Sequence, residues 1–177
     1  MPRLFPGPAA WLLSGCVATS PAVAGDESIA EASRLLEVTA TGEMFDSATR
    51  EQARQIIRAY SLIVASSADR DLPPHVREAI AECYRHNYAW ENFAEGIARI
   101  LTDHLSDKEI RLLIGIHENR GLPPMEIETF RQTVRKGDAI AAAGTEYIYR
   151  NSTGCAGRDA RLIKRFLDGD LGAADSS

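Results

Sequence analysis

The stretch LSDKEIRLLIGIHENRG, residues 105–121, contains the clearest helix start in the chain. Ser106 stands where an N-cap is expected, and Glu109 follows three residues later. This is the spacing of a capping box, in which each side chain bonds to the backbone N–H of the other residue. Leu105 and Ile110 flank the pair at the positions of a hydrophobic staple. A glycine closes the stretch, which therefore predicts an amphipathic helix with a defined beginning and end.

Three further helices are predicted upstream of this stretch, because apolar residues recur there every three or four positions. The first begins at a second capping box, formed by Ser28 and Glu31, and ends near Gly42. The second covers residues 47–66, and the third is one long helix over residues 75–104 that follows a Pro-Pro pair. Their apolar faces contain Ala32, Leu35 and Leu36; Ala53, Ile56, Ile57, Tyr60, Ile63 and Val64; and Val76, Ile80, Cys83, Asn87, Trp90, Ala94, Ile97 and Leu101.

The downstream part of the chain predicts more helices and no sheet. Gly137 divides a helix that follows Pro124 from a second piece over residues 138–150, and the last helix covers residues 158–167. The residues expected to face inward are Ile127, Phe130 and Val134, and Leu162, Ile163 and Phe166. Because no segment alternates with a period of two, we expect one all-α domain of about five to seven amphipathic helices over residues 25–167. A disordered tail is expected over residues 168–177.

Length and composition fit a single globular domain of 177 residues, of which 45% are hydrophobic. The formal net charge of −5 argues against general nucleic-acid binding, since phosphate groups repel an acidic protein. The chain has no run of 18 apolar residues, so no membrane-spanning helix is expected.

The N-terminal region contains two overlapping export signals. The sequence AVA predicts signal-peptidase cleavage between Ala24 and Gly25, with residues 1–24 as the signal peptide. The sequence LSGC fits a lipobox, and cleavage after residue 15 would then leave a lipid-bearing Cys16. The first alternative predicts a periplasmic or secreted protein, and the second predicts an outer-membrane lipoprotein. Both place the chain outside the cytosol.

Three stretches together resemble a known bacterial family. They are ASRLLEVT, FAEGIARILTDHLSDKEIRLLIGIHENRGLPP, and a helical stretch that ends in GTEYIYRN. The chain is similar over residues 29–150 to the periplasmic helical family catalogued as domain of unknown function 2059. The most specific part is residues 105–121, where this chain has Ile116-His117 in place of the family's common Phe-Tyr pair. The resemblance implies a periplasmic helical protein, and it implies no substrate, cofactor or catalytic residue.

The three cysteines predict one disulfide bond. Either export signal removes Cys16 from the pool of free thiols, by cleavage or by lipidation, and this leaves Cys83 and Cys155 to pair. The alternative is a buried core cysteine at position 83 and a free loop thiol at position 155. A bond would join the third predicted helix to the turn before the last one.

Candidate catalytic and metal-binding residues give weak signals. Cys83 and His86 lie one helical turn apart and are the best metal-ligand candidates, although a third ligand would have to come from elsewhere. Acidic pairs that can support acid–base chemistry occur at Glu78/Glu82, Glu91/Glu95 and Glu126/Glu128. Solvated helix faces are the favoured explanation of these pairs, because arginines lie close to the first two of them in sequence. No P-loop, GxSxG, GxGxxG or HExxH motif is present, so no cofactor is expected.

The last predicted helix is basic within an otherwise acidic chain. Its cations are Arg158, Arg161, Lys164 and Arg165. The helix can contact an anionic membrane or an acidic partner, or it can pack as an ordinary terminal helix. We expect a non-catalytic interaction or envelope-associated module that binds an envelope protein or ligand. The alternative is a hydrolase-like or metal-dependent enzyme that uses glutamate and histidine in an interhelical cleft.

Overall fold

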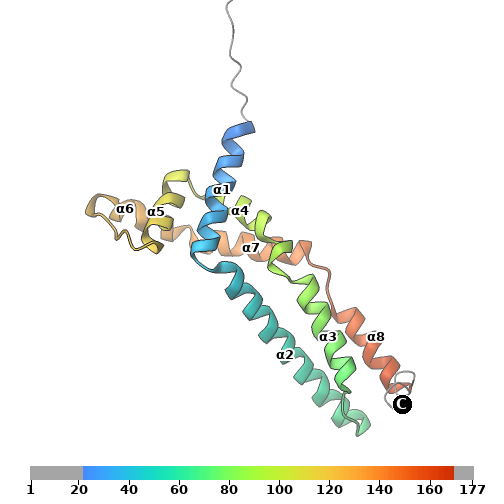
Figure 1. The fold of residues 1–177 in the computed structure, drawn as a ribbon. Helices are drawn as coiled ribbons and strands as arrows, with labels where there is room; N and C mark the ends of the chain where they lie inside the picture. The colour runs from blue at the N-terminus through green and yellow to red at the C-terminus, as the bar shows by residue number, and fades with distance from the viewer. Residues whose placement is uncertain (1–21, 170–177) are drawn as a thin grey trace, which may run out of the picture.

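The computed structural model describes residues 22–169 and confirms the all-α prediction, since these residues contain no strand. Figure 1 shows an elongated arrangement. The long helix α2 runs beside α3 at one end of the molecule, and α1, α4, α5 and α7 gather at the other end. The helical elements are α1 (Ala22–Val38), α2 (Thr41–Ala68), α3 (Pro74–Asn87), η1 (Trp90–Asn92), α4 (Ala94–His104), α5 (Asp107–His117), η2 (Pro124–Glu126), α6 (Ile127–Arg135), α7 (Gly137–Asn151) and α8 (Ala156–Leu167).

The apolar side chains form two separate cores. The first, here named the N-terminal core, lies between α1, α4 and α5 and contains Ala32, Leu35, Leu36, Ala98, Leu101, Leu105, Ile110 and Ile114. The second, here named the disulfide core, lies between α2, α3 and α8 and contains Ala53, Val64, Leu72, Val76, Ile80, Cys83, Tyr84, Cys155 and Phe166. Burial of these faces against one another supplies the main driving force for the fold.

The start of α5 has the predicted geometry. The backbone N–H of Glu109 donates to Ser106 Oγ at 3.4 Å, and the backbone N–H of Ser106 donates to Glu109 Oε2 at 2.8 Å. Leu105 and Ile110 are both buried in the N-terminal core, as a staple requires. Local sequence therefore fixes the point where α5 begins.

The predicted start of the first helix is wrong. The helix α1 begins at Ala22, so Ser28 lies inside it, and the Ser28 hydroxyl donates to Asp107 Oδ1 at 2.8 Å instead of capping. The Ser28 side chain, which the local pattern predicted to cap a helix, instead makes a tertiary contact with the start of α5. The predicted cleavage bond before Gly25 falls in the first turns of α1. Cys16 and most of the predicted tail lie outside the described residues.

The predicted long helix over residues 75–104 is also wrong, because it divides into α3, η1 and α4. The backbone N–H of Trp90 leaves the helical pattern and donates to Asp46 Oδ1 at 3.1 Å. The Asn92 side chain donates to the His86 carbonyl at 2.8 Å, and Phe93 is buried at the break. These long-range and side-chain contacts outweigh the continuous helical periodicity.

Three residues that the periodicity placed in the core are exposed: Ile63 at 60%, Val134 at 57% and Ile127 at 42%. The helix α6 instead turns Thr133 inward, and its hydroxyl donates to Glu109 Oε1 at 3.2 Å. Periodicity identifies residues that share a face, but it does not determine whether another element covers that face.

The division at Gly137 is confirmed, since α6 ends at Arg135 and α7 begins at Gly137. Within residues 22–169, none of the helices combines the length and apolar character needed to cross a bilayer.

Candidate functional site

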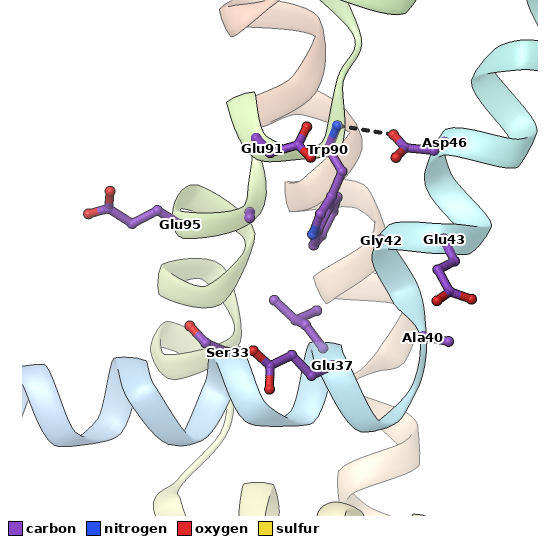
Figure 2. A pocket seen from close by; sticks show the side chains of 11 residues that line it. Ser33, Glu37, Ala40, Gly42, Glu43, Asp46, Trp90, Glu91 and Glu95 are labelled. Carbon is purple, nitrogen blue, oxygen red and sulfur yellow. Dashed lines mark hydrogen bonds between the residues drawn. The ribbon is translucent and has the colours of Figure 1, made fainter.

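A hollow of about 700 Å³ lies where the end of α1, the start of α2, η1 and the start of α4 meet. Figure 2 shows the Trp90 side chain extending from η1 into the space between these helices, with Asp46 and Glu91 near it and Glu95 pointing away. The lining residues are Ser33, Leu36, Glu37, Ala40, Gly42, Glu43, Asp46, Trp90, Glu91, Ala94 and Glu95. The lining thus combines apolar residues, including Leu36 and Trp90, with five carboxylates.

A tight turn shapes one side of the hollow. Ala40, between α1 and α2, has a φ of 51°, in the left-handed region, and the chain changes direction there from α1 to α2 (Figure 1). Gly42 follows in the first turn of α2, and a Cβ at this position would lie 2.6 Å from Cδ1 of Trp90. Only glycine allows the indole to approach the α2 backbone this closely. The prediction that the first helix ends near Gly42 is therefore wrong: α1 ends at Val38, and Gly42 lies inside α2, where it packs against Trp90.

Asp46 and the neighbouring aromatic rings hold Trp90 in place. Asp46 Oδ1 accepts the backbone N–H of Trp90, which fixes η1 against α2. The ring of Phe45 lies 5.6 Å from that of Trp90 and 5.7 Å from that of Phe93, between centroids. Aromatic pairs at these separations stabilise one another beyond simple burial. The indole is therefore positioned by Phe45 of α2, which in turn packs against Phe93 at the start of α4.

Five acidic residues of the hollow come from two stretches that are distant in sequence, residues 37–46 and 91–95: Glu37, Glu43, Asp46, Glu91 and Glu95. Glu95 is paired with Arg99 at 2.5 Å. Among the described residues, Glu37, Glu43 and Glu91 form no ion pair. Carboxylates beside an indole provide both the charge and the aromatic surface that attract a cation.

A second, more apolar groove of about 510 Å³ lies on the other side of Phe45. It runs between α2, α3 and the turn before α8, and its larger apolar residues are Phe45, Ile56, Tyr84 and Tyr88. Because Phe45 lines this groove and also contacts Trp90, a single aromatic wall separates the groove from the acidic hollow.

The predicted disulfide is present between Cys83 and Cys155, whose Cα atoms lie 6.0 Å apart. Both cysteines are buried, and the Asn87 amide donates to the Thr153 carbonyl beside them at 2.9 Å. The sulfur of Cys83, which the sequence offered as a metal ligand together with His86, is used in this disulfide bond. The His86 side chain is exposed. Within residues 22–169, no group of three or more histidine, cysteine or acidic residues is arranged to hold a metal.

The three predicted acidic pairs have different surroundings. Glu78 and Glu82 both pair with Arg85, as expected for a solvated helix face. Likewise, Glu126 pairs with Arg120 and Glu128 with Arg131. The remaining pair, Glu91 and Glu95, lines the hollow.

The acidic groups with clearly shifted pKa values lie outside the hollow. Burial alone would raise the pKa of Glu109, but hydrogen bonds from Lys136 and Ser106 outweigh it and lower that pKa to about 2. Burial raises the pKa of Asp159 in the disulfide core, although the Tyr84 hydroxyl donates to it at 3.1 Å. All four histidines are exposed or half-buried, so neither buried carboxylate belongs to a buried histidine–glutamate cluster.

Sequence reasoning missed Trp90 as a site residue, together with Glu37, Glu43 and Asp46. A signal was available, because residues 26–46 contain six acidic residues and one basic residue. Their convergence with Glu91 and Glu95 depends on the turn at Ala40 and on the break before α4. No protein-family model, curated protein or solved structure matches the chain.

Proposed function

We propose that this protein is a non-catalytic interaction module of the bacterial periplasm, related to the family of unknown function that it resembles, and that its acidic hollow receives a cationic group of a partner. The observation that carries the proposal is the convergence of acidic residues from two distant stretches around Trp90. The hollow is in the size range of sites for small ligands and single side chains.

The physical basis is electrostatic. Because Glu37, Glu43 and Glu91 form no ion pair among the described residues, a cation can approach them without displacing a protein cation. The Trp90 ring adds a cation–π attraction of about 0.5–2 kcal/mol, depending on how far the cation is desolvated. A lysine or arginine side chain, or a small amine, has the matching charge and size.

The disulfide supports export, since such bonds persist in oxidising compartments and are rare in the cytosol. We propose the signal-peptidase product that begins at Gly25, with the Cys16 lipoprotein as the alternative. Cell fractionation with mass measurement of the mature N-terminus decides between them. Recovery from the cytosol with the N-terminal segment intact would contradict the proposed compartment.

Binding of an oligoarginine peptide tests the hollow. The triple variant Glu37→Gln/Glu43→Gln/Glu91→Gln is expected to bind it at least about tenfold more weakly than the wild type, which corresponds to about 1.4 kcal/mol of lost attraction. Isothermal titration calorimetry at low ionic strength measures the difference, because salt screens such contacts.

The matched control is Glu78→Gln/Glu82→Gln/Glu128→Gln, which removes the same charge from exposed positions outside the hollow. If both triple variants lose the same affinity, binding follows net charge and the hollow is not the site. Gly42→Ala provides a second test, since the added methyl group displaces Trp90 without changing any charge. Unchanged affinity in this variant would remove Trp90 from the site.

A further inference from the structure

The outer face of α8 concentrates positive charge. Arg158, Arg161, Lys164 and Arg165 are all exposed, and they fall within about 120° of the helix circumference at 100° per residue. Three of them line a shallow hollow together with Asp168. Arg161 and Arg165 form no ion pair among residues 22–169. The opposite face of α8 is apolar and packs on the disulfide core through Phe166.

Exposed apolar residues lie at the same end of the molecule. Leu167 at the end of α8 is 38% exposed, and Leu62 and Ile63 near the end of α2 are 72% and 60% exposed. The two helix ends are joined, because Arg70 Nη1 donates to the Phe166 carbonyl at 3.3 Å and its guanidinium lies 4.2 Å from the centre of the Phe166 ring. Figure 1 shows these two helix ends at one tip of the elongated fold.

We propose that this tip, formed by the basic face of α8 and the ends of α2 and α8, binds the surface of an anionic phospholipid membrane. Exposed cations and exposed leucine and isoleucine side chains at one end of a molecule are the combination that favours a lipid–water interface. The charges attract anionic headgroups, and the apolar side chains gain by leaving water.

The way α8 is held indicates peripheral binding by a folded tip. The disulfide at Cys155 secures the start of α8, and at its end Phe166 is buried and contacted by Arg70. The cationic face is therefore presented on a rigid support, and the helix does not have to leave the core to reach lipid.

The charge distribution also orients the molecule on a membrane. The acidic hollow lies where α1, the start of α2, η1 and α4 meet. In Figure 1, α1 and α4 lie at the opposite end of the fold from the tip of α8. An anionic surface attracts the basic tip and repels the acidic end, so the bound protein leaves the hollow open to a partner. Membrane binding does not depend on the proposed function of the hollow.

Vesicle co-sedimentation tests the inference. Protein purified from the envelope fraction is mixed with vesicles of phosphatidylcholine, or of phosphatidylcholine with phosphatidylglycerol. We expect the wild type to prefer the anionic vesicles and to lose this preference as salt is added. Any lipid on Cys16 would raise binding to both vesicle types, so the ratio between them isolates the electrostatic contribution.

The variant Arg161→Gln/Arg165→Gln is expected to bind anionic vesicles roughly thirtyfold more weakly, because each basic residue near such a surface contributes about 1 kcal/mol. The matched control is Arg131→Gln/Arg135→Gln, two exposed arginines at the same spacing on α6. Circular dichroism checks that both variants remain folded. Equal binding to the two vesicle types by the wild type, or equal losses in the two variants, would overturn the proposal.

Discussion

The first turns of α5 and α8 each contain a buried carboxylate, and the two carboxylates have opposite properties. Glu109 is surrounded by donors, and Lys136 Nζ lies 2.8 Å from its Oε2. Asp159 is completely buried, and its Oδ1 has no hydrogen-bond partner. The pKa of Glu109 is therefore lowered, and that of Asp159 is raised. The difference shows that the surrounding donors, rather than burial alone, determine whether a buried carboxylate stabilises the fold.

The largest expected effect on stability comes from removing the disulfide bond between Cys83 and Cys155. Replacing both cysteines, Cys83→Ala/Cys155→Ala, should lower the free energy of unfolding by about 4 kcal/mol, because the bond closes a loop between residues 72 apart. Denaturant unfolding measures the loss. Reductant should destabilise the wild type and leave the double variant unchanged. Two free thiols in the non-reduced wild type would contradict the bond itself.

Removing the charge at the start of α5 should have the next largest effect. Glu109→Gln is expected to lower the free energy of unfolding by about 2 kcal/mol at pH 7, since it leaves Lys136 without its partner and weakens the capping box. Glu128→Gln, at an exposed position on α6, is the control. If the two variants lose the same free energy of unfolding, the buried position of Glu109 contributes nothing to stability.

The pH dependence of wild-type stability sharpens this prediction. The folded pKa of Glu109, about 2, lies below the ordinary value of 4.5. Its stabilising contribution is therefore complete above pH 4.5 and is lost as the pH falls towards 2. Glu109→Gln should remove this acid-sensitive part of the unfolding curve. If the stability of Glu109→Gln depends on pH as that of the wild type does, groups other than Glu109 cause the acid sensitivity.

For Asp159 we expect the opposite dependence of stability on pH. Because its folded pKa is raised above the ordinary value of 3.8, the unfolded chain gives up this proton first as the pH rises through 3.8. Asp159 therefore destabilises the fold at higher pH, and the effect is complete above its raised pKa. The hydroxyls of Tyr84 and Tyr60 and the charge of Arg158 offset part of it.

Asp159→Asn should accordingly gain stability relative to the wild type between pH 4 and pH 7, by about 1 kcal/mol, the lower end of the cost of a buried polar atom without a partner. Chemical unfolding across this range measures the gain. A constant difference between variant and wild type at every pH would show that ionisation of Asp159 is not its cause.

The smallest effect is expected where α1 docks on the start of α5. Ser28→Ala removes the hydrogen bond to Asp107, and because this contact is exposed the loss should be about 0.5 kcal/mol. Ser47→Ala, an exposed serine in α2, is the control. A loss above about 2 kcal/mol would assign Ser28 a structural role beyond this single hydrogen bond.

Local patterns predicted the helix starts that depend on nearby residues. Ser106 and Glu109 are three residues apart, so their bonds form whenever α5 forms. The same pattern failed at Ser28, because the helix continues through it and the hydroxyl contacts α5 instead. At Val134 periodicity identified a shared face correctly, but within residues 22–169 no element covers that residue, which is 57% exposed.

The sequence by itself predicted the helical class, the boundary at Gly137 and the pairing of Cys83 with Cys155, because each follows from residues that are close in sequence or from simple counting. Only the tertiary structure decided that Glu37, Glu43, Asp46 and Glu91 meet around Trp90. Trp90 and Glu91 follow the other three residues by more than 40 positions, and the two stretches converge because the turn at Ala40 and the contact from Asp46 to Trp90 set the path of the chain. Such convergence depends on long-range packing, which hydrophobic periodicity does not record.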